Sequence, residues 1–162
     1  IERLGLDGGK MLLRLDYSDP GTNRTLEACA RTVAYLAERR LMAMVEPLPA
    51  RRDETGRVRV SADPDELVEA VAVSSALGTT SAYTWLKLPA ADHMERVMAA
   101  TTLPALLLGG DPGDRAAKLY ASWRTALAIP NVRGLVAGRS LLYPAGGDVA
   151  GAVDMAVRVV HG

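Results

Sequence analysis

The 162-residue chain has one cysteine, Cys29, and two histidines, His93 and His161. A single thiol cannot form an internal disulfide, and this fits a reducing compartment, so we expect a cytoplasmic protein. Cys29 occupies an apolar face of an expected helix, which favours a core position over a nucleophilic role. One histidine lies early in an expected helix and the other at the C-terminus, so the sequence indicates neither a metal cluster nor a serine–histidine–aspartate triad.

The chain also lacks net charge and long hydrophobic segments. Its 19 basic and 19 acidic residues give a formal net charge of +0, so we expect neither nucleic acid nor a membrane surface as a partner. No apolar run approaches the ~20 residues that a membrane helix needs. No signal peptide is visible, and because the first residue is Ile1 rather than methionine, we expect that an N-terminal piece precedes it.

Lysine is scarce compared with arginine. Only three of the 19 basic residues are lysines, namely Lys10, Lys87 and Lys118. Arginine stays protonated and cannot form an imine, whereas lysine can lose its proton and act as a nucleophile. In a chain whose usual cation is arginine, a lysine within a strand is therefore a candidate for covalent chemistry.

Short apolar runs alternate with longer helical patterns along the whole chain. The sequence predicts five strands, at 10–16, 41–46, 82–88, 104–108 and 133–137. It predicts five helices, at 22–40, 64–77, 91–100, 112–128 and 148–160. Asp63 and Pro64 combine a helix N-cap with a proline at the first helical position, and Thr22 or Asn23 is the expected cap of the first helix.

The second predicted strand is followed by residues that interrupt regular structure. Pro47 and Pro49 are expected to end the strand at 41–46. The arginine-rich stretch 51–60 is expected to be a solvated loop. Contact of its arginines with an anionic substrate or a neighbouring subunit is the alternative interpretation.

Strict alternation of strands and helices indicates a parallel sheet with right-handed crossovers, and the length and composition suit one globular domain covering 1–162. A dinucleotide-binding Rossmann fold needs a G-x-G-x-x-G motif after the first strand, but Gly8 and Gly9 precede that strand. Five βα units do not close a barrel, which takes about 250 residues. We therefore expect the C-terminal part of a (β/α)8 TIM barrel, strands 4 to 8, rather than an open doubly wound sheet.

In such a barrel, alternate side chains of each strand face the lumen, and the active site lies at the C-terminal strand ends. The expected lumen residues are Lys10, Leu12, Arg14 and Asp16 of the first strand, Met42, Met44 and Glu46 of the second, and Tyr83, Trp85 and Lys87 of the third. The opposite faces are apolar and suit helix packing. Charged residues on an otherwise buried strand are costly unless they are paired or functional.

Lys87 is the strongest candidate for a nucleophile. Its neighbours Tyr83, Trp85 and Pro89 are expected to desolvate the ammonium group and lower the pKa of Lys87. Glu46, at the end of the preceding strand, is well placed to transfer protons while an imine forms. An ion pair between Lys87 and Glu46 without any chemistry is the alternative interpretation.

Glycine-containing turns follow the last two predicted strands. Gly109 and Gly110 follow one strand, and Gly138 and Arg139 follow the next. The loops after strands 7 and 8 of barrels commonly bind phosphate, because glycine lets backbone N–H groups approach the anion, and an arginine adds a charged contact. Ordinary turn glycines are the alternative.

Five segments in order resemble the DeoC/LacD class I aldolase superfamily, and most closely a LacD-like bacterial branch of barrel proteins associated with inositol catabolism. They are Gly9-Lys10-Met11-Leu12-Leu13 with Asp16-Tyr17, Met44-Val45-Glu46-Pro47, Trp85-Leu86-Lys87-Leu88-Pro89, Leu108-Gly109-Gly110 and Val136-Ala137-Gly138-Arg139-Ser140. The resemblance covers essentially all of the chain.

The resemblance implies a lyase that cleaves or forms a C–C bond in a phosphorylated keto-sugar or sugar acid. By position it implies that Lys87 is the Schiff-base lysine, that Glu46 is the acid/base and that Lys10 is a further active-site lysine. It matches the two glycine-containing turns, with Gly109, Gly110, Gly138 and Arg139, to a phosphate grip. Arg14 and Asp16, on the expected lumen face of the first strand, are expected substrate or phosphate contacts. No metal or other cofactor is expected, and the assembly is expected to be a homo-oligomer.

Two functions remain open from the sequence. One is a Schiff-base aldolase. The other is a phosphate-ligand-binding or isomerase-like barrel in which Lys87 is only an electrostatic contact. They differ in whether Lys87 forms an imine with a carbonyl compound.

Overall fold

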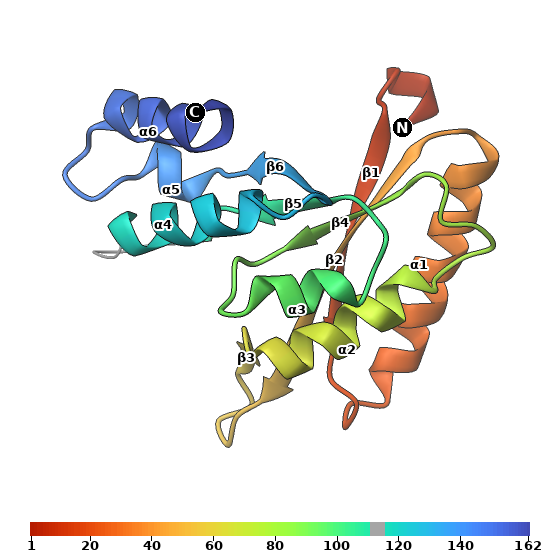
Figure 1. The fold of residues 1–162 in the computed structure, drawn as a ribbon. Helices are drawn as coiled ribbons and strands as arrows, with labels where there is room; N and C mark the ends of the chain where they lie inside the picture. Colours follow the sequence, from red (N-terminus) through yellow and green to blue (C-terminus); the bar gives the residue numbers. More distant parts are fainter. Residues whose placement is uncertain (111–115) are drawn as a thin grey trace.

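Five parallel strands form one sheet in the order β1-β2-β4-β5-β6, and a short strand, β3, pairs antiparallel with the end of β2 (Figure 1). The structure is a computed structural model that describes residues 1–110 and 116–162. The strands are β1 (Gly8–Leu15), β2 (Met42–Arg52), β3 (Val58–Val60), β4 (Thr84–Leu88), β5 (Ala105–Leu108) and β6 (Val132–Val136). This is the partial (β/α)8 barrel that the alternating pattern predicts.

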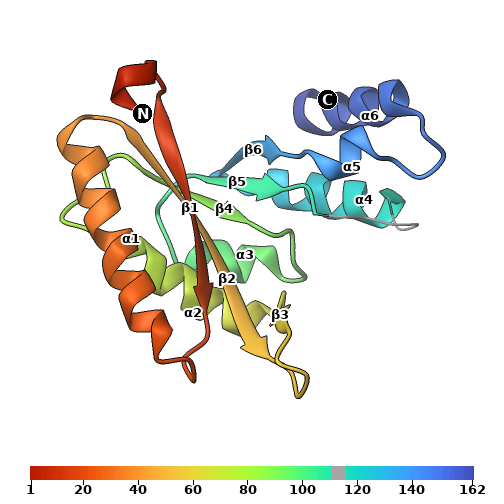
Figure 2. The same ribbon diagram turned by 180° about the vertical axis from the view of Figure 1, so that it is seen from behind.

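Helices connect the strands. A short 3-10 turn, η1 (Glu2–Leu4), precedes β1. The α-helices are α1 (Gly21–Glu38), α2 (Pro64–Ser75), α3 (Met94–Ala99), α4 (Ala116–Leu127), α5 (Arg139–Leu142) and α6 (Val149–His161). In Figure 2, α1, α2 and α3 lie behind β1, β2 and β4, so these helices cover a single face of the sheet. None of the helices among the described residues has the length and hydrophobicity to span a membrane.

Side-chain alternation separates a buried face of the sheet from an open one. The buried face packs on the helices and includes Leu13, Leu15, Ala43, Val45, Leu86, Leu88, Ala105 and Leu107. Val33 and Leu36 of α1, Leu67 and Val71 of α2 and Trp123 of α4 complete the core. The other face corresponds to the lumen of a barrel, and it carries the charged residues that the strand pattern placed there.

Strand β2 runs beyond its predicted end, through Pro47 and Pro49. The N–H of Ala43 donates to the carbonyl of Tyr83 at 2.8 Å, on the β4 side. N–H groups of alternate strand residues point the same way, so both proline nitrogens also face that side. Among the described residues, pairing with β4 extends only as far as Val45, so the prolines remove no hydrogen bond to β4. They remove none to β1 either, because their nitrogens face away from it.

The expected loop at 51–60 is instead a hairpin. Arg51 pairs with Arg59 and Arg52 with Val58, on β2 and β3. Between them, the Asp53 carboxylate accepts hydrogen bonds from the N–H groups of residues 55 and 57 and from the hydroxyl of residue 55, which closes a tight turn. The turn depends on side-chain hydrogen bonds of the aspartate, which the arginine-rich composition of the stretch does not indicate.

Helix starts were predicted with mixed success. Asp63 caps α2 as expected, because its side chain accepts from the N–H groups of the second and third helical residues. The expected cap of α1 at Thr22 or Asn23 is wrong. This helix begins at Gly21, whose N–H donates to the Asp19 carboxylate at 2.8 Å, while the Thr22 hydroxyl donates to the carbonyl of Asp16. Helix α5 and η1 were not predicted, and residues 112–115 of another expected helix lie outside the described residues.

Substituting leucine by alanine should have very different effects on the two faces of the sheet. Leu86 is 0% exposed and Leu12 is 41% exposed. We expect Leu86→Ala to lower the free energy of unfolding by about 2–5 kcal/mol, because it leaves a cavity against the helices. Leu12→Ala should lower it by no more than about 1 kcal/mol. Urea denaturation of both variants of this chain measures the difference, and equal losses would contradict the assignment of the faces.

The outer strands of the sheet should promote self-association. Within the described residues, β1 pairs only with β2, and β6 pairs only with β5. Each therefore presents unpaired backbone groups along one edge, which invites pairing with another chain. We expect the isolated 162-residue chain to be oligomeric or prone to aggregation. Light scattering after size-exclusion chromatography tests this, and a stable soluble monomer would refute it.

Candidate active site

Three charged side chains from three adjacent strands meet on the lumen face. The Lys10 Nζ atom lies 2.8 Å from Oε2 of Glu46, and the Lys87 Nζ atom lies 3.3 Å from Oε1 of the same carboxylate. Glu46 on β2 therefore bridges a lysine on β1 and a lysine on β4. We call Lys10, Glu46 and Lys87 the lysine–glutamate triad.

The register of the parallel strands explains this meeting. Leu12 is the partner of Glu46 across the β1–β2 pair, so Lys10 starts two residues nearer the N-terminal end of its strand. Its long side chain reaches along the lumen face to the carboxylate. On the other side, Val45 is the partner of Leu86, which brings Glu46 level with Lys87 when the register continues by one residue. The predicted adjacency of these two strands is correct.

Burial makes the triad an unusual group of charges. The side chains of Glu46 and Lys87 are 10% and 16% exposed, whereas that of Lys10 is 44% exposed. Burial alone raises the pKa of Glu46, but the hydrogen bond from Lys10 and the charge of Lys87 outweigh it, and the net effect lowers the pKa of this carboxyl below its ordinary value. Glu46 is therefore an anion near neutral pH.

This arrangement can transfer protons between a lysine and a carboxylate. The Glu46 carboxylate is in contact with the Lys87 ammonium and can accept a proton from it. Removing that proton produces a free amine on the lumen side of the sheet, next to open space rather than core. Lys10 keeps a positive charge beside the carboxylate. These are the elements that a carbonyl compound would need to form an imine with Lys87.

The structure does not bring Arg14 and Asp16 into the triad. Arg14 is two residues beyond Leu12 on β1 and is level with Leu48 of β2. The Asp16 carboxylate accepts hydrogen bonds from the N–H and the hydroxyl of Ser18, and the serine hydroxyl is the main reason that the pKa of Asp16 is lowered. Arg14, an expected lumen residue, forms no ion pair with Glu46 among the described residues, because it lies farther toward the strand end.

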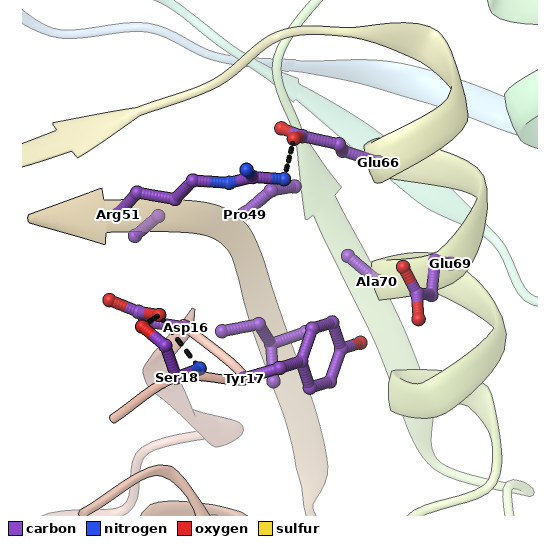
Figure 3. Close-up of a pocket in the computed structure, with 10 residues that line it drawn as sticks. Asp16, Tyr17, Ser18, Pro49, Arg51, Glu66, Glu69 and Ala70 are labelled. Carbon is purple, nitrogen blue, oxygen red and sulfur yellow. Dashed lines mark hydrogen bonds and ion pairs between the residues drawn. The ribbon is translucent and has the colours of Figure 1, made fainter. Parts of the chain in front are cut away.

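A separate hollow of about 270 Å³ lies between the loop after β1 and helix α2 (Figure 3). In Figure 3, Tyr17 points across it toward Ala70 and Glu69, and Arg51 reaches over to Glu66 at 2.6 Å. Burial first, and the charge of Glu69 second, raise the pKa of Tyr17. This hollow is on the helix side of the strand ends and is distinct from the triad.

The glycine turns lie at the ends of β5 and β6, as predicted. Gly110 has φ of +62°, a conformation that favours glycine. A Cβ at Gly109 would lie 2.8 Å from the backbone of Ala137 and from the Ser140 hydroxyl oxygen, so a side chain cannot fit there without displacing the backbone. The N–H of Gly109, however, donates to the carbonyl of Val136 and is not available to an anion as expected.

Helix α5 begins directly after the second turn, with Gly138 as its N-cap and Arg139 as its exposed first residue. Ser140 is 2% exposed, and its hydroxyl oxygen has no hydrogen-bond partner among the described residues. A Gly-Arg-Ser sequence after a strand was the signal for this turn, but the burial of the serine was not predicted. A hollow of about 460 Å³ beside Gly109 and Gly110 is also lined by Lys118, the third lysine of the chain.

The model of the Cgl0159-like family matches residues 1–157 of this chain. The chain belongs to the Cgl0159-like family. The crystal structure of Cgl0159 from Corynebacterium glutamicum is 46% identical, with a TM-score of 0.92. The similarity covers 99% of this chain but only 53% of the Cgl0159 structure. This Cgl0159-like chain therefore spans about half of the length of that relative. Comparison with curated proteins gives no match.

Two structures of aldolases resemble the chain at lower identity. An archaeal fructose 1,6-bisphosphate aldolase is 15% identical, with a TM-score of 0.78, over 98% of this chain and 60% of its own. A Schiff-base-forming fructose-1,6-bisphosphate aldolase is 16% identical, with a TM-score of 0.76, over 99% and 60%. These likenesses show the fold alone: the Cgl0159-like chain has the α/β fold of part of a TIM barrel, similar to that of these two structures. They do not distinguish the LacD-like branch.

Acid should remove the stabilisation that Glu46 provides. The folded-state pKa of Glu46 is lowered, so the folded protein binds fewer protons than the unfolded chain, and the stabilisation is present above the ordinary glutamate pKa of about 4.3 and lost as pH falls through the folded value. We expect Glu46→Gln to lower the free energy of unfolding by about 1–3 kcal/mol at neutral pH, because two lysines lose their partner. The difference should shrink below pH ~4.

Urea denaturation of wild type and Glu46→Gln at several pH values measures this dependence. Glu54→Gln is a matched control, because Glu54 is an exposed glutamate in the β2–β3 turn. A deficit that stays constant from neutral to acid pH would show that the carboxylate charge is not the source of the stabilisation.

Proposed function

We propose that this chain carries the catalytic half of a class I, Schiff-base aldolase that cleaves or forms a C–C bond in a phosphorylated keto-sugar or sugar acid. The observation that supports it is the largely buried Lys87 ammonium in contact with the Glu46 carboxylate on the lumen face. The likeness to Schiff-base-forming aldolases agrees with this proposal. The proposal also includes a relationship to the LacD-like branch of aldolases.

The proposed reaction begins with proton transfer from Lys87 to Glu46. The free amine attacks the substrate ketone carbon and forms a C–N bond, and the resulting carbinolamine has a hydroxyl group. Protonated Glu46 returns its proton to that hydroxyl, which leaves as water, and an iminium ion remains. Lys10 stabilises the carboxylate form of Glu46 between these steps.

The iminium ion then acts as an electron sink. Glu46 removes the proton of the substrate hydroxyl next to the bond that breaks, the C–C electrons move into the iminium, and an aldehyde and an enamine are formed. The enamine takes up a proton, and water hydrolyses the new iminium to release the second carbonyl product and free Lys87. No metal or other cofactor takes part in this proposal.

The substrate phosphate is assigned to the turns after β5 and β6. Gly138 has open space where a side chain would be, and the buried Ser140 hydroxyl lies close to Gly109. Gly110 and Arg139 complete this proposed phosphate grip, with Arg14 and Asp16 as proposed substrate contacts nearer the opposite edge of the sheet. Because the N–H of Gly109 is bonded within the protein, its proposed role is to allow close approach rather than to donate.

The proposal extends to the setting of the protein. The unpaired groups on β1 and β6 support a larger assembly in which other strands complete the barrel, and we propose a homo-oligomer in the cytoplasm. Its partner is a small phosphorylated sugar.

One observation favours a second candidate function. Both lysines of the triad are already in ion pairs with Glu46, which is also what a purely electrostatic ligand contact would show. A phosphate-ligand-binding or isomerase-like barrel without imine chemistry would then use Lys87 to neutralise an anionic ligand. Covalent trapping separates this alternative from the aldolase.

Lys87→Arg in the complete natural polypeptide should abolish turnover but preserve the fold. Arginine keeps the positive charge beside Glu46 but has no titratable amine to attack a carbonyl. We expect the rate to fall by several orders of magnitude, whereas losing only an electrostatic contact costs about 10²–10³-fold. Glu46→Gln should be milder, with a loss of about 10²–10⁴-fold.

The measurement is borohydride reduction with a panel of phosphorylated ketoses, followed by mass spectrometry. Wild type should gain one covalent adduct on the peptide that contains Lys87. Lys118→Arg is the matched control, because it removes a lysine outside the triad and should leave the adduct yield unchanged. If Lys87→Arg still traps at the same yield, or retains turnover within tenfold of wild type, the imine forms elsewhere, with Lys10 as the next candidate.

A further inference from the structure

The β2–β3 hairpin projects from the molecule with little of its own surface buried. In Figure 2 its turn extends beyond the arrowhead of β1, and every residue of 51–60 except Asp53 is exposed. Val58 and Val60 are 40% and 51% exposed. The segment has four arginines and two acidic residues, so its surface is basic. Arginine is enriched at protein interfaces, whereas a two-stranded hairpin that covers no core contributes little to its own stability.

One arginine of the hairpin has no partner. The other three arginines of the segment each form an ion pair with a carboxylate of the same chain. The Arg57 side chain makes no ion pair or hydrogen bond with any residue in 1–110 or 116–162. Its backbone N–H donates to the Asp53 carboxylate, so the tight turn holds its main chain while the guanidinium group faces solvent.

The hollow of about 270 Å³ between the loop after β1 and α2 has the opposite charge. Helix α2 contains three acidic residues and no basic residue. Of the two glutamates that line the hollow, Glu66 pairs with Arg51, whereas Glu69 has no ion pair or hydrogen bond with any described residue. In Figure 3 the Tyr17 ring points across the hollow toward Glu69. A carboxylate opposite an aromatic ring suits a guanidinium group, which pairs with the first and stacks on the second.

Both surfaces lie away from the open edges of the sheet. The hairpin follows β2, which pairs with β1 on one side and with β4 on the other. The hollow is on the helix side, between the loop after β1 and α2. Strands that add to the sheet beside β1 or β6 extend it at its edges, so their pairing does not occupy the hollow.

The hairpin and the hollow adjoin each other, because Arg51 at the base of the hairpin also lines the hollow. Within one copy Arg57 and Glu69 do not form an ion pair. Two copies related by a two-fold axis beside Arg51 can each offer a hairpin to the hollow of the other. A two-fold interface repeats every contact, so one complementary pair of charges acts twice.

We propose that this hollow receives the β2–β3 hairpin of a second copy of the chain, with Arg57 of one copy paired with Glu69 and stacked on Tyr17 of the other. The inference rests on the homo-oligomer of the proposed function and adds the surface that joins two copies. It does not require imine chemistry. The contact covers the exposed valines of the hairpin and gives both unpaired charges a partner.

The test is charge reversal in the complete natural polypeptide, with association measured by sedimentation velocity over a range of concentrations. Wild type should associate. Arg57→Glu and Glu69→Arg each place like charges at both contacts, so each should weaken association by about 100-fold or more. The double variant restores opposite charges at both contacts and should associate within about tenfold of wild type. Arg124→Glu on α4 and Glu95→Arg on α3 are the matched controls, because they reverse exposed charges elsewhere and should change nothing.

A second measurement joins the two surfaces directly. Arg57→Cys protein mixed with Glu69→Cys protein should form a disulfide between copies under mild oxidation, located by mass spectrometry at these two positions. The mixed dimer keeps one unchanged Arg57–Glu69 contact, so it still assembles. Arg124→Cys mixed with Glu95→Cys should give no such link.

The interface is refuted if wild type is monomeric, if neither reversal weakens association, or if the mixed cysteine variants do not crosslink. If wild type associates in this way but borohydride traps no phosphorylated ketose, the proposed aldolase function fails and the interface stands.

Discussion

One carboxylate shared by two lysines is the constraint on which the lumen face of this protein depends. Glu46 is 8% exposed and touches both Lys10 and Lys87. A buried carboxylate or a buried ammonium group without a partner is costly, and this cost applies to Glu46 and Lys87, whereas the Lys10 side chain is 44% exposed. The Glu46 carboxylate can reach both lysines only in the observed register, so the two ion pairs favour this alignment of β1, β2 and β4. The same contacts that satisfy the charges also place a proton acceptor beside an amine.

The two faces of the sheet separate the core residues from the residues of the proposed site. Leu13, Val45 and Leu86 point to the helices and are fully buried, while Leu12, Glu46 and Lys87 are the adjacent positions on the other face. Because side chains alternate along a strand, Glu46 and Lys87 each lie between neighbours that are buried in the core. The proposed chemistry is thus placed on strands that the core holds in position.

The proposed site is spread over most of the chain. The triad comes from the first three parallel strands, and the glycine turns come from the last two. The backbones of the two turns lie close together, because Gly109 packs against Ala137 and leaves no room for a side chain. A family member that spans about half of its solved relative therefore holds the proposed nucleophile, the proposed proton acceptor and the proposed phosphate grip in one sheet, and among the described residues both edges of that sheet lack a further partner strand.

The sequence by itself determined the order of strands and helices and the face on which Glu46 and Lys87 lie, because hydrophobic alternation is a local property that core packing enforces. It did not determine that β2 continues through Pro47, since this depends on which neighbour the missing N–H would have faced. Nor did it determine that Lys10 reaches Glu46 while Arg14 does not. Register between strands is a tertiary property, and a separation of four residues along β1 distinguishes Lys10, which forms an ion pair with Glu46, from Arg14, whose side chain has no ion pair among the described residues.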